Sequence, residues 1–268
     1  MTRTVLLDAD LLAFMSSAAT QRSYDFPSDD GTPAISADLD DAIEKAEDQI
    51  NRLIDRLKVD ELIVCLSDDF SSFRKDRIDS TYKEHRTSER PQQLYPLKDW
   101  LRETYDVEER PTLEADDVMG IIATDPERSD ERIIVSADKD MLTIPGKLYM
   151  PHRQTTKSGA WSKRPIIYNV TPTQAWRFHF WQAIVGDQTD GYKGAFRVGP
   201  KSHYAEAVLE ADDEEEAWEW VISAFHKAGQ TEAEAVVQAR LARILQYEDY
   251  ENERPKLWLP PYSGERDI

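Results

Sequence analysis

The chain has 268 residues, a formal net charge of −19 and 40% hydrophobic residues. This composition supports a folded core, and seven Trp residues argue against a disordered chain. The lone cysteine, Cys65, excludes an internal disulfide and suits a reducing compartment. Carboxylates interrupt the apolar start of the chain, so we expect neither a signal peptide nor a membrane span, and we expect a cytoplasmic location without a membrane partner.

In chain order, "TVLLDAD" predicts a short buried strand, and residues 37–58 repeat apolar positions at helical spacing. "DELIVCLSDDF" predicts a second strand, residues 92–106 and "EADDVMGIIAT" predict helices, and "ERIIVSADKDM" predicts a third strand. "KLYMPHR" and "PIIYNV" predict short strands or a hairpin. Strands that alternate with helices predict an α/β fold with a mostly parallel sheet flanked by helices.

The remainder of the chain is predicted to be mainly helical. "TPTQAWRFHFWQAIVG" begins this region, and the tail "TEAEAVVQARLARILQYEDY" predicts one more helix. Between them, "RVGPKSHYAEAVL" predicts a helix whose first turn is set by Pro200. Gly199 permits close backbone approach and Lys201 lies at the helix start, so this segment is suited to a duplex phosphate, although a plain helix start has the same pattern.

Carboxylates follow each of the three predicted strands. Taken singly, each group is explained by turn or helix-capping chemistry. Together they would meet at the carboxyl edge of a parallel sheet, where such concentrated negative charge requires cations. Ligation by oxygen alone favours Mg²⁺ or Mn²⁺, and two such ions about 4 Å apart suit phosphodiester hydrolysis. The groups at the strand ends are Asp8 and Asp10, Asp68 and Asp69, and Asp138 and Asp140. Two further groups join them: Glu114, Asp116 and Asp117 at the start of a predicted helix, and Asp187 and Asp190 in a predicted loop.

Basic residues gather in two zones of this acidic chain. Residues 141–186 hold no Asp or Glu, and residues 70–90 hold six Lys and Arg residues. In the second zone, Lys83 and Arg86 stand at helical spacing, and Arg74 lies nearby. These residues are suited to a phosphate path, and a solvated salt-bridge helix is the alternative.

The motifs "LLDAD", "SDD…FRK…YKEHR", "LEADDVMG", "SADKDM" and "GDQTDGYKGAFRVGPK" occur in this order. The chain thereby resembles the flap endonuclease / 5′→3′ exonuclease superfamily, and most of all its bacteriophage 5′→3′ exonucleases, from about Val5 to about Gly199. The resemblance implies a PIN-like α/β nuclease domain over residues 1–180, with a helical arch around 70–95. It implies a helical region with a duplex-binding helix–turn–helix over residues 181–268.

The resemblance also implies the site residues. Two Mg²⁺ (or Mn²⁺) would be the cofactors, with K⁺ at the helix–turn–helix. Catalysis would rest on Lys83, Arg86 and Asp138, with Lys83 stabilising charge at the scissile phosphate. DNA would contact Arg74, Lys83, Arg86, Lys193, Gly199, Lys201 and Ser202. The metal ligands would be Asp8, Asp68, Glu114, Asp116, Asp117, Asp138, Asp140, Asp187 and Asp190, with Asp68 preferred over Asp69 and the role of Asp10 open.

The predicted function is divalent-metal-dependent hydrolysis at the 5′ ends or 5′ flaps of duplex DNA, and RNA of an RNA–DNA hybrid is a second expected substrate. The setting would be replication, recombination or primer removal, in a host cytoplasm if the chain is viral. No protein partner is predictable. The alternatives are a PIN-type ribonuclease and a non-catalytic acidic protein, either a DNA mimic or a Ca²⁺-binding module. The ribonuclease should lack "YKEHR" and "VGPKS", and a DNA mimic would spread its charge over the surface.

Overall fold

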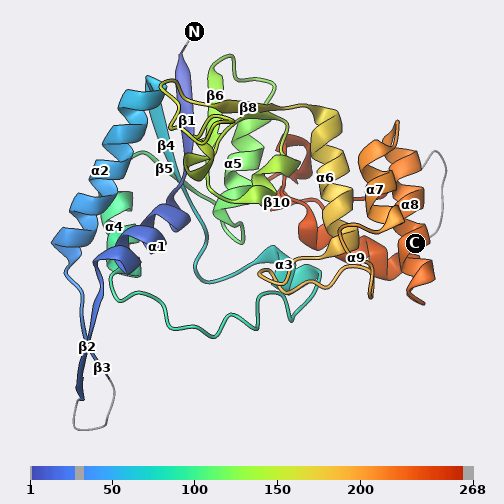
Figure 1. Cartoon of the computed structure of the whole chain (residues 1–268), viewed down its shortest axis with the longest axis horizontal. Helices are drawn as coiled ribbons and strands as arrows, with labels where there is room; N and C mark the ends of the chain where they lie inside the picture. The colour runs from blue at the N-terminus through green and yellow to red at the C-terminus, as the bar shows by residue number, and fades with distance from the viewer. Residues whose placement is uncertain (1, 28–32, 262–268) are drawn as a thin grey trace.

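A six-stranded sheet forms the N-terminal part of the protein (Figure 1), for which a computed structural model describes residues 2–27 and 33–261. Its strand order is β5-β4-β1-β6-β7-β8, and only β8 runs antiparallel to its neighbour. The predicted α/β sheet is confirmed, and the two short strands predicted for "KLYMPHR" and "PIIYNV" pair antiparallel at its edge. The strands are β1 (Arg3–Asp8), β4 (Glu61–Leu66), β5 (Val107–Glu109), β6 (Glu131–Val135), β7 (Gly146–Tyr149) and β8 (Ile167–Val170).

Helices cover both faces of the sheet because its central strands are apolar on both sides. Val5 and Leu7 pack in one core cluster with residues of α1 (Ala9–Thr20), α2 (Leu39–Leu57) and α4 (Leu94–Thr104). Leu6, between them in sequence, faces the other way and packs in a second cluster with α5 (Ala115–Ala123). The carboxyl ends of β1, β4 and β6 therefore open at a single edge, which points downward in Figure 1.

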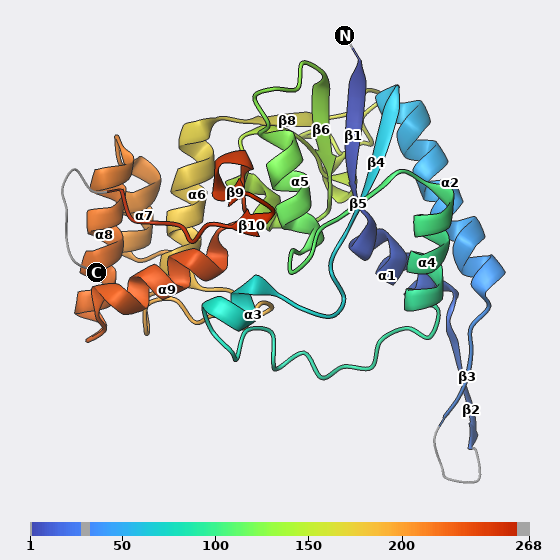
Figure 2. The same cartoon turned by 180° about the vertical axis from the view of Figure 1, so that it is seen from behind.

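Four helices form a separate core beside the sheet (Figure 2). They are α6 (Pro172–Val185), α7 (His203–Glu210), α8 (Glu214–Lys227) and α9 (Glu232–Ala242), and Phe180, Trp218 and Phe225 are buried among them. Helix α6 runs through residue 180, where the sequence predicts a domain boundary. Its Ala175 packs in the sheet-side core and its Phe180 in the helical core. Residues 262–268 of the predicted C-terminal region lie outside the described residues.

The tail helix is shorter than the sequence predicts. Helix α9 ends at Ala242 instead of continuing to Tyr250. Residues 243–245 leave the helix because their backbone is used elsewhere: the Arg243 carbonyl accepts from Arg74, and the Leu245 amide donates to Asp117. A short 3₁₀ turn (Tyr247–Asp249) and the paired strands β9 (Tyr250–Glu251) and β10 (Arg254–Pro255) follow.

An antiparallel hairpin is a feature that the sequence does not predict. Its strands, β2 (Arg22–Pro27) and β3 (Pro33–Ser36), project from between α1 and α2 on the carboxyl-edge side of the molecule (Figure 1). Three further short elements are α3 (Phe73–Arg77) and the 3₁₀ turns η1 (Lys139–Thr143) and η2 (Pro151–Arg153).

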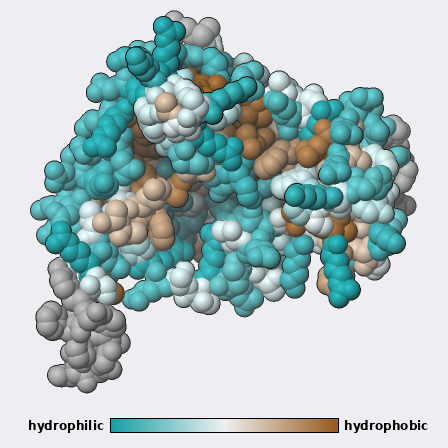
Figure 3. Space-filling model, viewed as in Figure 1, coloured by the Kyte–Doolittle hydropathy of each residue, from teal (hydrophilic) through white to brown (hydrophobic). Residues whose placement is uncertain are grey.

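The surface is mostly hydrophilic on the face shown in Figure 3, and apolar side chains gather on this face near the join between the sheet and the helical part. In the described part of the chain, no helix combines the length and the apolar character needed to span a bilayer.

Candidate active site

The carboxylates predicted from the strand ends meet because β1 and β6 are parallel neighbours. Asp8 ends β1 and is 7% exposed. Ser136, directly after β6, donates to Asp8 Oδ2 over 2.6 Å, which ties the two strand ends together. Asp138 follows two residues later, and its charge contributes to the electrostatic environment of both Asp8 and Asp116. Helix α5 begins at the same edge, so it brings Asp116 to the strand-end carboxylates.

Negative charge in this cluster is under-compensated. Burial, with the charges of Asp10 and Asp138, raises the pKa of Asp8 to about 6. Burial and neighbouring carboxylates, chiefly Asp8 and Asp138, raise the pKa of Asp116 well above its usual value. Burial and Asp138 also raise the pKa of Asp140 to about 6. Such shifts occur where carboxylates share a site that is short of positive charge.

Lys83 neutralises the charge of Glu114 on the more buried side of the cluster. Its ammonium lies 2.9 and 2.8 Å from the two Glu114 carboxylate oxygens and 3.6 Å from Asp190 Oδ2. Burial alone would raise the pKa of Glu114, but Lys83 and Arg74 lower it to about 2. Tyr82, which the sequence analysis overlooked beside Lys83, donates toward Asp190 Oδ2 over 3.1 Å. Lys83 is therefore an ion-pair partner of the acidic cluster in this structure.

Lys139 and Arg86 neutralise carboxylates on the more exposed side of the cluster. Lys139 bridges Asp187, over 2.5 Å, and Asp140, over 3.2 Å. Arg86 donates to Asp190 Oδ1 over 2.6 Å. Seven carboxylates thus face four cationic side chains: Lys83, Arg86 and Lys139, and also Arg74, whose guanidinium lies 3.6 Å from Glu114 Oε2. The carboxylates are Asp8, Glu114, Asp116, Asp138, Asp140, Asp187 and Asp190. We call these seven residues the carboxylate cluster.

The donor set of the carboxylate cluster fits hard divalent cations, because it is made of carboxylates whose raised pKa values reflect unmet negative charge. Within residues 2–27 and 33–261, however, no three Asp, Glu, His or Cys side chains stand close enough together to hold an ion. Lys83 and Lys139 occupy oxygens that a metal would use. These oxygens are thus already neutralised by ammonium groups.

Asp117 and Arg74 have structural roles instead of the predicted ones. Arg74 is 2% exposed and binds both Asp117 oxygens, at 2.6 and 2.8 Å. Asp117 is fully buried and also accepts from the Leu245 amide. The structure therefore places neither side chain where the sequence predicts it: Arg74 is buried away from a DNA surface, and both oxygens of Asp117 are bound by Arg74.

The carboxylates that follow β4 also have other partners. Asp68 accepts hydrogen bonds from the Phe70 amide, the Ser71 hydroxyl and the Thr112 amide, over 2.9, 2.7 and 2.8 Å. Asp69 pairs with the buried Lys98, which also binds Asp10. The structure therefore brings neither Asp68 nor Asp69 into the carboxylate cluster. Asp10, on α1, binds Lys98 on α4 and so links the two helices.

The segment around Lys83 is not the helix that its spacing predicts. Helix α3 stops at Arg77, and residues 80–85 form turns. Lys83 has a φ of 57°, a left-handed conformation that costs an ordinary residue about 1–2 kcal/mol. That turn still directs both Lys83 and Arg86 to Asp190. In Figures 1 and 2 the segment from α3 to α4 passes across the carboxyl edge as an open loop.

The predicted duplex-binding residues lie on the loop between α6 and α7. Lys193, Gly199 and Lys201 are exposed there. Helix α7 begins at His203, later than predicted, and Ser202 is its N-cap, accepting from the Ala205 amide. Two exposed residues are not singled out by any sequence motif: Arg197, on the same loop, and Phe14, 47% exposed on α1, the helix that follows Asp8.

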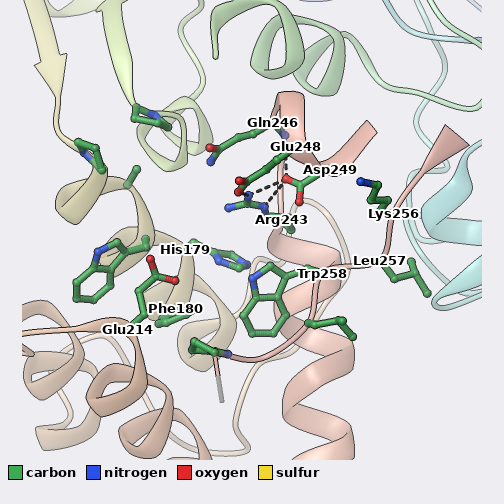
Figure 4. Close-up of a pocket in the computed structure, with 16 residues that line it drawn as sticks. His179, Phe180, Glu214, Arg243, Gln246, Glu248, Asp249, Lys256, Leu257 and Trp258 are labelled. Atoms are coloured by element: carbon green, nitrogen blue, oxygen red, sulfur yellow. Dashed lines mark hydrogen bonds and ion pairs between the residues drawn. The ribbon is translucent and has the colours of Figure 1, made fainter. Parts of the chain in front are cut away.

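A pocket of about 500 Å³ lies between the sheet and the helical part (Figure 4). It reaches Pro145 at the amino end of β7, the opposite edge of the sheet from the carboxylate cluster. His179 and Trp258 line it, as does Arg243, which is paired with Asp249 over 2.7 Å. None of its lining residues belongs to the carboxylate cluster.

The sheet, its helices and the acidic edge place the protein among the α/β enzymes that gather carboxylates at the ends of parallel strands. Residues 3–160 match the family model of the 5′-3′ exonuclease N-terminal resolvase-like domain. The chain belongs to this 5′-3′ exonuclease family.

Curated relatives agree with this assignment. The chain is 30% identical to an exodeoxyribonuclease of Enterobacteria phage T3, over 96% of this chain and 92% of the relative. It is also 30% identical to an exonuclease of Escherichia phage T7, over 74% of each chain. Among solved structures, the T5 5′-exonuclease with bound divalent metal ions (zinc) matches with a TM-score of 0.63 and 15% identity, over 90% of this chain and 89% of that one. This structural likeness supports the fold.

Proposed function

We propose that this protein is a divalent-metal-dependent 5′→3′ exonuclease that hydrolyses phosphodiester bonds at the 5′ ends of duplex DNA. The observation that carries the proposal is the carboxylate cluster, in which Asp8, Asp116 and Asp140 remain short of positive charge. Family membership and the phage relatives support the 5′→3′ polarity, because an acidic cluster alone serves either direction.

Two Mg²⁺ or Mn²⁺ ions, held by members of the carboxylate cluster, would supply an activated water and neutralise charge on the leaving oxygen. A T5 flap endonuclease has been solved with DNA and metal ions, which is consistent with this assignment. The oxygens of Glu114, Asp140 and Asp187 are held by lysines in the described chain, so they would be released as the substrate binds.

The chain's own cations would orient the substrate. Once free of Glu114, Lys83 would donate to the scissile phosphate, and Arg86 would bind the neighbouring backbone. Both stand on the open loop between α3 and α4, where the 5′ strand would pass. The turn before α7 would grip the duplex through Lys193, Lys201 and the backbone at Gly199, and the Ser202 cap orders that turn. K⁺ at this turn is part of the same proposal.

A cleavage assay tests the function. Duplexes labelled at the 5′ or the 3′ end, a 5′ flap and an RNA–DNA hybrid are incubated with Mg²⁺, with and without EDTA. We expect metal-dependent products released from the 5′ end, and loss of cleavage in Asp138→Ala. The matched control is Asp212→Asn, which removes an exposed carboxylate outside the cluster. Cleavage that persists in EDTA, or full activity in Asp138→Ala, refutes the proposal, and cleavage of RNA alone favours the PIN-type ribonuclease.

Duplex binding is tested by its salt dependence. If Lys201 contacts one phosphate, Lys201→Ala weakens binding of every sequence and reduces the slope of log K against log salt concentration by about 0.9. An unchanged slope removes Lys201 from the binding surface.

A further inference from the structure

Lys139 lies between two of the proposed metal ligands, and the reaction proposed above gives it no contact with the substrate. It stands in the 3₁₀ turn η1, one residue from both Asp138 and Asp140. Its ammonium lies 2.5 Å from Asp187 Oδ2 and 3.2 Å from Asp140 Oδ1. Lys139 therefore links the sheet side of the cluster to the loop that follows α6.

The two carboxylates are held in place without Lys139. Gln182 on α6 donates to Asp140 Oδ1 over 2.7 Å. The Thr189 amide donates to Asp187 Oδ1 over 2.7 Å. Both carboxylates therefore have partners in their own surroundings, and Lys139 contributes charge rather than position.

Exposure differs between the lysine and its partners. The Asp140 and Asp187 side chains are 14% and 10% exposed, whereas the Lys139 side chain is 48% exposed. A flexible lysine that reaches inward from solvent can withdraw without repacking a core. The carboxylates would remain in place for another cation.

We propose that Lys139 is a built-in counter-ion of Asp140 and Asp187, which a divalent cation displaces, so that Lys139 sets the affinity of the site for metal. This inference rests on the proposed function. An ammonium and a divalent ion compete for the same oxygens, so the protein binds metal only in the fraction of molecules in which Lys139 has withdrawn.

Binding of Mn²⁺ alone, without DNA, tests the proposal by titration calorimetry. We expect Lys139→Met to bind Mn²⁺ about 10-fold more tightly, as when the metal-competent fraction rises from about one-tenth to nearly all molecules. Lys139→Arg keeps the charge and should gain little affinity. The matched control is Lys147→Met, which removes a lysine paired with Glu131 away from the cluster and should bind as the wild type does.

Melting temperature gives a second readout that also verifies folding. Without metal, Lys139→Met should melt below the wild type, because two carboxylates lose their counter-ion, and Mn²⁺ should raise its melting temperature more. Equal or weaker Mn²⁺ binding by Lys139→Met overturns this inference while the proposed function stands. Failure of the wild type to bind Mn²⁺ overturns both.

Discussion

The buried pair of Arg74 and Asp117 gives the sharpest prediction about single residues. The sequence assigns Arg74 to DNA, whereas the structure buries it between α5 and the chain that follows α9. Its guanidinium binds both Asp117 oxygens and the carbonyls of Leu241 and Arg243. Arg74→Ala therefore removes four hydrogen bonds and leaves the fully buried Asp117 charge without its cation.

Breaking a buried ion pair by removing one partner costs about 3–5 kcal/mol. For a chain of this size, that lowers the melting temperature by about 6–20 °C. Asp117→Asn should be destabilised in the same direction, because it leaves the Arg74 charge unpaired. Lys75→Ala, an exposed neighbour on α3, should stay within about 0.5 kcal/mol of the wild type.

Thermal and urea unfolding, followed by circular dichroism, measure these effects. A double variant, Arg74→Leu with Asp117→Leu, should lose less stability than the sum of Arg74→Ala and Asp117→Asn, because no lone charge remains buried. If Arg74→Ala melts with the wild type and loses only DNA affinity, then Arg74 is a substrate contact and the reasoning fails.

Two further predictions concern His179 and the glycines around the site. Burial lowers the pKa of His179 from 6.5 to about 3, so the unfolded chain binds the proton first, and stability present above pH 6.5 is lost as pH falls. Between pH 8 and pH 5 the free energy of unfolding should fall by about 2 kcal/mol from this cause. The fall should be absent in His179→Gln, and equal pH profiles of unfolding for this variant and the wild type would contradict the prediction. Gly194 has a φ of 64°, and a Cβ there would stand 2.2 Å from the Ile184 carbonyl oxygen, so Gly194→Ala should displace the Asp187 loop and reduce cleavage. A Gly194→Ala protein with full activity would contradict the proposed role of the Asp187 loop in cleavage. The Cβ of Gly199→Ala would meet no atom within 4 Å, so this variant should fold normally. If the DNA backbone approaches Gly199, Gly199→Ala should bind DNA more weakly than the wild type.

The sequence predicts the sheet and its acidic edge well, because apolar runs that end in carboxylates have one natural arrangement in a parallel sheet. The sequence cannot show which of Asp116 and Asp117 faces the site. Successive residues on a helix point about 100° apart, so Asp116 faces the carboxylate cluster while Asp117 faces Arg74. Which direction leads to the site depends on how α5 packs, and that is a tertiary property.

Other differences have the same origin. The periodicity of the tail continues past Ala242, but the helix ends where its backbone meets Arg74 and Asp117. The spacing of Lys83 and Arg86 fits a helix, yet their carboxylate partners hold them in a turn. Tertiary hydrogen bonds and ion pairs outweigh local propensity at these places.

The central claim is that the carboxylate cluster holds the metal ions of a 5′-nuclease, and Asp116 tests it most directly. The measurement is the rate of Mg²⁺-dependent release of 5′-terminal nucleotides from duplex DNA by wild type and Asp116→Asn, with melting temperatures taken on metal-free portions of the same preparations. We predict a rate at least about 100-fold lower in the variant. Its melting temperature should be equal or higher, because burial beside Asp8 raises the pKa of Asp116 and the amide removes that repulsion. A folded Asp116→Asn protein that cleaves at the wild-type rate would contradict the account.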